Sequence, residues 1–329
     1  MALLEVTGLS THYFLQESRV RAADNVTFSV KRGTTLGIAG ESGCGKTTVA
    51  LSIMRLLPAA GKIIKGRVIL DGQDLLSLST EEMRQARWKE LSYIFQFAMN
   101  AFNPVMNVGE QIVEVILEKE GRIRGRFSRS QKKEAWRQVG DLFEEVGLDP
   151  QRVKNYPHEF SGGMKQRAVI AMALACDPKV IIADEPVTAL DVVVEKQILH
   201  LLKSCCEKYN LANILITHDL SVIAENSDEV GIMYAGKLVE VGDAKAIFSK
   251  GLHPYTNMLI QSFPSILGEK RRIEPLRGIP PDLANPPPGC RFHPRCPLAT
   301  DECQAKAPPY EEQSPRHFVA CYHAGEFGS

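Results

Sequence analysis

The sequence predicts an α/β fold in which apolar strands alternate with helices and end in glycine-rich or charged segments. One such segment, "GESGCGKT" at 40–47, stands between the apolar run "TTLGIA" and the stretch "TVALSIMRLL", whose apolar residues have helical spacing. A second apolar run, 180–183, has the length of a buried parallel strand and is followed by Asp184 and Glu185. Ligands bind at the carboxyl ends of parallel strands, so both segments are candidate site segments.

Length, composition and charge narrow the classes of protein. The 329 residues suffice for two domains, one of them large. Hydrophobic residues make up 44% of the chain and charged residues 24%, which is ordinary for a globular protein. The 39 basic residues balance 39 acidic ones, so no net field attracts a polyanion. Nucleic acid is therefore a poor candidate partner.

The cysteine content and the chain ends bear on the compartment. No stretch approaches the roughly 18 consecutive apolar residues of a membrane-spanning helix, and "MALLEVTGLS" lacks the pattern of a signal peptide. We therefore expect a cytosolic chain whose eight cysteines are thiols or metal ligands. Cys44 is interpreted as a bystander, with a redox role as the alternative. The last residues, "EFGS" at 326–329, resemble a cloning remnant and stay outside the fold prediction.

The segment 40–47 has the residue types of a phosphate-binding loop. Its glycines allow successive backbone N–H groups to turn inward, and the following helix presents its positive end. Lys46 can reach the β- and γ-phosphates of a nucleotide, and the Thr47 hydroxyl suits Mg²⁺. An ordinary glycine-rich turn is the alternative, which the strand and helix flanks disfavour. The residues predicted to line this site are Gly40, Ser42, Gly43, Cys44, Gly45, Lys46, Thr47 and Thr48.

Polar groups that follow other strands would complete a nucleotide site. Asp184 is predicted to hold Mg²⁺ through water, and Glu185 to polarise the attacking water. The run "LSYIF" ends in Gln96, and "NILIT" ends in His218. A lone histidine is more often a satisfied core or surface residue, but this one falls where a γ-phosphate contact is needed.

A second anion-binding segment precedes the carboxylates. In "FSGGMKQ", Ser161, Gly162 and Gly163 open the helix "MKQRAVIAMALAC", 184 − 161 = 23 residues before Asp184. One nucleotide has no use for two such cradles in one chain. Two chains that face each other head to tail would use both.

The order of these motifs across roughly residues 3–250 resembles the ATP-binding subunit of an ABC transporter. The resemblance implies a P-loop NTPase core of the ABC ATPase type, with an N-terminal antiparallel β subdomain and an inserted helical subdomain at about 97–165. It also implies an ATPase domain at 1–250, followed by a Pro- and Cys-rich extension at 251–325. Within the insertion, Ser128 and Gln131 predict a capping box.

The resemblance implies a role for each motif. Tyr13 would stack on adenine, Gln96 would sense the γ-phosphate and bind Mg²⁺, and Glu185 would act as general base with His218 at the γ-phosphate. Thr47 and Asp184 would complete the Mg²⁺ site. The groups that close on the partner's ATP or face the interface between sites would be Ser161, Gly162, Gly163, Gln166 and Asp191. The apolar stretch after Gln96 would meet a membrane subunit, and a self-packed loop is the alternative.

The C-terminal region has its own composition. Of the 19 prolines, 13 lie between Pro254 and Pro315, which ends the regular domain. Four cysteines follow there, at positions 290, 296, 303 and 321. Four thiolates can hold an iron–sulfur cluster or zinc, and the long gaps favour the cluster over the paired knuckles of structural zinc sites. Zinc, no metal, and ligation by His293 or His317 remain alternatives. The predicted ligands are Cys290, Cys296, Cys303 and Cys321.

The tail "HPYT", "GIPP" and "GCRFHPRCP" resembles that of ATPase subunits of dipeptide and oligopeptide importers. This resemblance implies ATP and Mg²⁺ as cofactors, together with a 4Fe-4S cluster. It implies a second, related ATPase chain, two permease subunits, an external binding protein, and a peripheral position on the cytoplasmic face of the membrane.

Two alternatives concern function. Oligosaccharide or nickel import is one. The other is a soluble ABC ATPase that acts on DNA or ribosomes, which would show a coiled-coil insertion, a second ATPase unit or a basic patch. A non-hydrolysing regulatory partner is disfavoured because Glu185 and His218 are both present.

Overall fold

The computed structural model describes residues 2–119, 127–262 and 278–327. Parts of the predicted helical insertion (120–126), of the proline-rich connector (263–277) and of the predicted cloning remnant (328–329) lie outside the described residues. The chain forms two compact units. The first unit comprises Met1–Val30, Thr35–Leu76 and Leu215–Ser329; the second comprises Lys31–Thr34 and Ser77–Ile214.

The N-terminal part of the first unit is an antiparallel sheet, as predicted. Its strand order is β2-β1-β4-β5, and β1 and β4 pair from Leu4 opposite Leu70 to Tyr13 opposite Gly61. Alternating burial along β1 places Leu4 and Val6 in the core. The strands are β1 (Ala2–Phe14), β2 (Arg19–Lys31), β4 (Gly61–Leu70) and β5 (Gln73–Asp74).

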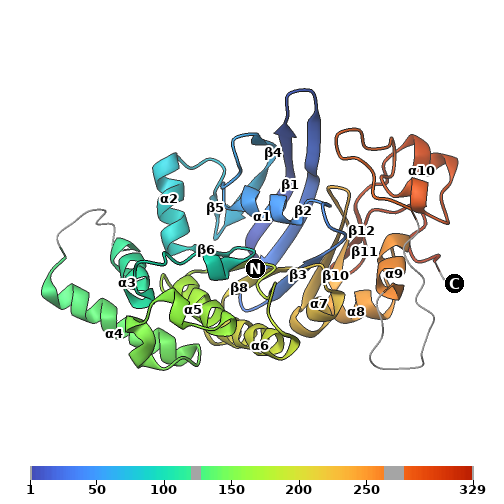
Figure 1. Cartoon of the computed structure of the whole chain (residues 1–329). Helices are drawn as coiled ribbons and strands as arrows, with labels where there is room; N and C mark the ends of the chain where they lie inside the picture. The colour runs from blue at the N-terminus through green and yellow to red at the C-terminus, as the bar shows by residue number, and fades with distance from the viewer. Residues whose placement is uncertain (1, 120–126, 263–277, 328–329) are drawn as a thin grey trace. The chain divides into compact units, whose positions relative to one another are not determined.

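A second sheet of the first unit joins the extension to β3, the strand that precedes the glycine-rich loop. Within this unit the order is β11-β12-β10-β9-β3, with β3 parallel to β9 and the other pairs antiparallel. The strands from the extension thus continue the sheet that carries the glycine-rich loop (Figure 1). The strands are β3 (Thr35–Ala39), β9 (Glu229–Tyr234), β10 (Lys237–Asp243), β11 (Glu311–Ser314) and β12 (His317–Val319).

Helices of the first unit are short. The predicted helix after the glycine-rich loop ends earlier than its apolar pattern, at Ile53, because Arg55 adopts a φ of 49° and Pro58 follows. The segment "HPYTNMLIQSFP" contains the short helix α9, capped by His253. The helices are α1 (Lys46–Ile53), α7 (Leu220–Asn226), α8 (Ala244–Ser249), α9 (Pro254–Gln261), η4 (His293–Arg295) and α10 (Asp301–Ala305).

The second unit combines parallel strands with the longer helices. Strands β6 (Leu91–Ile94) and β7 (Val180–Asp184) pair in parallel, and β8 (Ala212–Ile216) follows β7 in the sheet order. The predicted capping box at Ser128 is confirmed, since Ser128 Oγ accepts from Gln131 N and Gln131 Oε1 accepts from Ser128 N. The helices are α2 (Thr80–Lys89), η1 (Ala98–Asn100), α3 (Val108–Lys119), α4 (Arg129–Glu145), η2 (Pro150–Lys154), η3 (Pro157–Glu159), α5 (Gly162–Leu174) and α6 (Val192–Lys208).

The burial of apolar residues stabilises the long helices. On α6 both Cys205 and Cys206 are buried, at 1% and 3% exposure. Burial raises the pKa of Cys206 to about 12, so it is a small core residue rather than a reactive thiol. Within 2–119, 127–262 and 278–327, no helix combines the length and apolarity needed to cross a bilayer.

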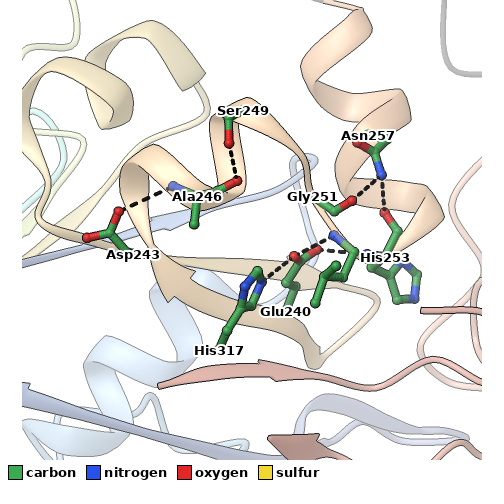
Figure 2. Close-up of polar contacts among 9 residues, drawn as sticks. Glu240, Asp243, Ala246, Ser249, Gly251, His253, Asn257 and His317 are labelled. Atoms are coloured by element: carbon green, nitrogen blue, oxygen red, sulfur yellow. Dashed lines mark hydrogen bonds and ion pairs between the residues drawn. The ribbon is translucent and has the colours of Figure 1, made fainter. Parts of the chain in front are cut away.

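A buried carboxylate ties β10 to α9 and β12. Glu240 is fully buried, and its two oxygens accept hydrogen bonds from the backbone N–H groups of Leu252 and His253, at 2.7 and 2.9 Å. His317 Nε2 lies 2.7 Å from Glu240 Oε1 (Figure 2). Burial raises the pKa of Glu240, but these hydrogen bonds lower it more, and the net shift is downward. The carboxylate therefore stabilises this corner in its charged form.

Glu240→Gln should lower the free energy of unfolding by about 2 kcal/mol at neutral pH, because an amide cannot accept from all three donors. The pKa of Glu240 is lowered on folding, so its stabilisation is present above the ordinary glutamate pKa and is lost as pH falls through the folded value. Denaturant unfolding from pH 7 downward measures both effects, and the variant should show a weaker acid dependence than the wild type.

The matched control is Asp243→Asn on the same strand. Asp243 is exposed and caps α8 by accepting from Lys245 N and from Ala246 N (Figure 2), and asparagine is an equally good cap. Equal losses of unfolding free energy in the two variants would show that the buried position of Glu240 adds no extra stability.

Candidate functional site

The glycine-rich loop at 40–47, called the phosphate loop from here on, lies between β3 and α1 in the first unit. Lys46 is buried, and its Nζ donates to the carbonyl oxygens of Gly40 at 2.8 Å and Glu41 at 3.2 Å. Its ammonium therefore lies against the loop itself. Ser42, Gly43 and Thr47 are exposed, so their backbone or hydroxyl groups are open to a ligand.

Two glycines of the phosphate loop are required by close backbone contacts. Gly40 has a φ of 151°, and a Cβ there would lie 2.1 Å from the Met233 carbonyl oxygen. Gly45 has a φ of 106°, and a Cβ there would lie 1.9 Å from the Ala22 carbonyl oxygen. No side chain fits either position, so the pattern of glycines follows from packing as well as from ligand access.

Other predicted residues of the first unit lie around the phosphate loop or follow β8. Tyr13 Oη lies 3.4 Å from Thr48 Oγ1, which places Tyr13 beside α1. Burial raises the pKa of the Cys44 thiol, which argues against the reactive thiolate of the redox alternative. His218 is exposed, immediately before Asp219 caps α7 through Ser221 N.

In the second unit, the predicted carboxylates occupy the end of β7. Asp184 is buried at 2% exposure, and its Oδ2 accepts a hydrogen bond from the Tyr93 hydroxyl at 2.8 Å. Burial, with the nearby Asp184 charge, raises the pKa of Tyr93, which keeps the donor protonated. Tyr93 was not predicted from the sequence; its place in the strand before Gln96, next to the carboxylate strand in a parallel sheet, was the available signal.

Glu185 and Gln96 are brought together by the parallel pairing of β6 with β7. Gln96 Nε2 donates to Glu185 Oε2 at 3.2 Å, and Thr188 Oγ1 donates to the same oxygen at 3.1 Å. Glu185 has a φ of 47°, a conformation that costs energy in a non-glycine residue and collects at functional positions. The two donors hold the carboxylate in place, which suits a group that must orient a water molecule.

The second predicted anion site is the N-terminus of α5. Ser161 caps the helix through Met164 N at 3.3 Å, and both Ser161 and Gly162 are exposed. Gly163 packs against α6, since a Cβ there would lie 2.6 Å from Val194 Cγ1. Gln166 is buried at 2% exposure, and its Nε2 has no hydrogen-bond partner within the described part of the chain.

Asp191 caps the neighbouring helix α6 by accepting from Val194 N at 3.0 Å. The two residues after it, Val192 and Val193, are 69% and 67% exposed. An apolar pair of this exposure next to a predicted interface residue is typical of a surface that another chain covers.

The four predicted metal-ligand cysteines line one small, partly enclosed cavity in the extension. Among the described residues, no set of three or more His, Cys, Asp or Glu side chains is placed to hold a metal ion. His293 lines the cavity, whereas His317 is bound to Glu240. His253 and His323, which the sequence analysis did not consider, also line it. We call it the cysteine cavity.

His253 is the most deeply buried of the histidines around the cysteine cavity, at 1% exposure. Burial lowers its pKa to about 4, so the ring is neutral at pH 7. Its Nδ1 accepts from Tyr255 N at 3.0 Å, which leaves the ring proton on Nε2. Nε2 has no hydrogen-bond partner among the residues that the structure describes.

Comparison with known families matches two segments. The ABC transporter family matches residues 23–188, which hold the phosphate loop and both carboxylates. The family described as "Oligopeptide/dipeptide transporter, C-terminal region" matches residues 239–303, which hold His253 and three of the four cysteines. The two matches together cover most of the residues that form the candidate sites.

Similar proteins include a probable peptide ABC transporter ATP-binding protein of Sinorhizobium fredii, 45% identical over 98% of this chain and 96% of its own length. The dipeptide transport ATP-binding protein DppD of Escherichia coli is 44% identical over 94% and 92%. A solved ATP-binding cassette, MJ0796, dimeric and bound to ADP and Pi, has a TM-score of 0.62 at 26% identity and covers 73% of this chain and 98% of that one. The chain therefore belongs to the ABC transporter family, among the ATP-binding proteins of dipeptide and oligopeptide transporters.

Proposed function

We propose that the chain is the ATP-hydrolysing motor subunit of a peptide-class ABC importer, working as a peripheral protein on the cytoplasmic face of the membrane. The observation that carries the proposal is the presence, in one chain, of the Gln96–Glu185 pair and of a tail that matches the C-terminal region of oligopeptide and dipeptide transporters. We assign ATP hydrolysis to residues 1–250 and a supporting role to the extension at 251–325.

In the first unit, the phosphate loop would hold the ATP phosphates. Lys46 would exchange the carbonyl oxygens of Gly40 and Glu41 for phosphate oxygens, which bind an ammonium more strongly because they are charged. Tyr13 would stack on the adenine ring, and the exposed His218 would contact the γ-phosphate.

In the second unit, Glu185 would orient and polarise the attacking water, with Gln96 and Thr188 fixing its carboxylate. Gln96 and Asp184 would bind Mg²⁺, as would Thr47 of the first unit. All three offer oxygen atoms, the donors that Mg²⁺ prefers, and Tyr93 leaves the charge on Asp184 intact because it donates its proton in a hydrogen bond only. When bound, Mg²⁺ would neutralise charge on the phosphates during transfer.

Two kinds of partner chain fit the exposed surfaces. A second ATPase chain would cover Asp191 and the exposed valines that follow it. The N-terminus of α5, with Ser161, Gly162 and Gln166, would contact the ATP bound to that second chain. We expect this chain to be a related but different one. Phe95, Phe97 and Val105, which are 47%, 51% and 78% exposed, would face one of two permease subunits.

The cargo class is tested on the native membrane complex, purified with its external binding protein. Mass spectrometry of the bound ligand should find short peptides. An oligosaccharide or nickel in their place would retain the motor role and overturn the peptide assignment.

We further propose that the cysteine cavity holds a 4Fe-4S cluster. Each of the four cysteines would hold one iron of such a cluster, whereas a zinc site would need all four thiolates around one ion. The gathering of the four cysteines around one cavity supports this choice. The unpartnered N–H of His253 would donate to a cluster sulfur. The cluster would add folding energy to a segment with little regular structure.

Protein purified without oxygen should contain about four irons and four sulfides per chain and should absorb broadly in the visible range. Cys303→Ser should lower the iron content at least twofold, because a serine oxygen is a poor ligand for the cluster. Cys206→Ser is the control, since Cys206 is equally buried but lies on α6. One zinc per chain, or the same iron content in both variants, would refute the cluster.

A further inference from the structure

An arginine of the extension pairs with the phosphate loop. Arg295 Nη1 donates to Glu41 Oε2 at 2.7 Å, and Arg295 Nη2 donates to Glu41 Oε1 at 3.0 Å. The two residues are 254 positions apart in the sequence but belong to the same compact unit. The Arg295 side chain is only 4% exposed, and that of Glu41 is 24% exposed. A two-pronged pair shielded to this extent is stronger and more directional than an ordinary surface salt bridge.

Aromatic residues hold both members of the pair. Arg295 Nη1 donates to the Tyr234 hydroxyl at 3.3 Å. The guanidinium carbon of Arg295 lies over the Tyr234 ring, 5.6 Å from the centroid of that ring. The backbone N–H of Glu41 donates to the Tyr255 hydroxyl at 3.2 Å. Phe292 of the extension is buried against both tyrosine rings. Glu41 is thus held through its backbone and its side chain by residues far along the chain.

The pair acts at a sensitive position of the phosphate loop. The Glu41 carbonyl accepts a hydrogen bond from Lys46 Nζ and another from Cys44 N, so any movement of Glu41 moves the groups that meet phosphate. A free carboxylate at the second position of this loop would also repel a triphosphate. Arg295 removes both problems, because it fixes the carboxylate and neutralises its charge.

We propose that Arg295 is a positioning residue for ATP binding, which acts by holding and neutralising Glu41 in the phosphate loop. The proposal rests on the proposed assignment of residues 40–47 to the ATP phosphates. Because Arg295 lies between Cys290 and Cys296, nucleotide affinity depends on the docked conformation of the cysteine segment. This gives the extension an influence on the ATP site that acts through one side chain.

The test is a double-mutant cycle on ATP affinity, measured by equilibrium dialysis of the full chain with labelled ATP. Arg295→Ala should weaken ATP binding about tenfold, the size of a charge-assisted pair lost next to an anion. In a Glu41→Gln background, removal of Arg295 should cause no further loss, since no carboxylate remains to be neutralised. Arg295→Lys, which keeps the charge without the fork, should lie between Arg295→Ala and the wild type.

The matched control is Arg291→Ala. Arg291 is also buried, pairs with Asp24 Oδ2 at 2.6 Å and binds the Ala235 carbonyl, but it does not touch Glu41. It should change ATP affinity less than twofold. Thermal unfolding is followed for every variant, and should Arg295→Ala fail to fold, Arg295→Lys in both backgrounds gives the same comparison.

Three outcomes would decide against the proposal. ATP affinity unchanged in Arg295→Ala would exclude a positioning role. The same loss in the Glu41→Gln background, or the same loss from Arg291→Ala, would mean that Arg295 serves only to dock the extension. Lys46→Ala tests the proposed phosphate site separately from the role of Arg295. If Lys46→Ala binds ATP as tightly as the wild type, the proposed phosphate site itself is wrong.

Discussion

Glu185→Gln should lower the rate of ATP hydrolysis by about 100-fold or more, the contribution of a well-placed general base. ATP affinity should change little, because the amide oxygen can still accept from Gln96 Nε2 or Thr188 Oγ1 and the side chain keeps its volume. Phosphate release at saturating ATP and equilibrium dialysis measure the two quantities separately.

Glu110→Gln is the matched control, an exposed glutamate in the first turn of α3 in the same unit. It should hydrolyse ATP at the wild-type rate. Wild-type hydrolysis in Glu185→Gln would remove Glu185 from the role of general base. Parallel loss of ATP binding and hydrolysis would instead assign it to the architecture of the β7 end.

Gly45→Ala should abolish measurable ATP binding. The new Cβ would lie 1.9 Å from the Ala22 carbonyl oxygen and close to the Met233 side chain, and the residue would keep a φ of 106° that alanine adopts poorly. Backbone cannot yield as a flexible side chain can, so the phosphate loop must change shape. Equilibrium dialysis with labelled ATP measures the loss, and thermal unfolding reports the accompanying destabilisation.

Gly72→Ala separates backbone strain from the clash. Gly72 has a φ of 85° in the same unit, but a Cβ there meets no atom within 4 Å. This variant should lose roughly 1–2 kcal/mol of unfolding free energy and keep its ATP affinity. If Gly45→Ala behaves in the same way, the phosphate loop tolerates a side chain at this position and the packing argument is wrong.

Much of the candidate site was predictable because it consists of residues that lie close together in the sequence. The phosphate loop, the Ser128 capping box and the strand before Asp184 depend on residues within a few positions of one another. Local hydrogen bonds and side-chain period decide such features, so a reading of neighbouring residues is enough. For the helix after the phosphate loop, only the predicted C-terminal end was wrong, because Arg55 adopts a positive φ although the apolar pattern continues past it.

Contacts between segments distant in the sequence could not be predicted from local residue patterns. The Tyr93–Asp184 bond joins residues 91 positions apart, and the place of Tyr93 in the strand before Gln96 is the one sign of it in the sequence. The role of Glu240 was equally hidden, since a glutamate in an apolar strand gives no sign of its partners at 252, 253 and 317. Such contacts depend on strand order and on how the chain returns to the sheet.

The sequence by itself determined the phosphate loop, the carboxylate proposed as general base and the existence of four cysteines in a proline-rich tail, because each is a matter of residue type at short spacing. Only the tertiary structure decided that these cysteines line one cavity and that Arg295 of the same tail binds Glu41 of the phosphate loop. The physical reason is that a pair 254 residues apart forms only when β12 docks on β10 and the aromatic rings of α9 and the tail pack together.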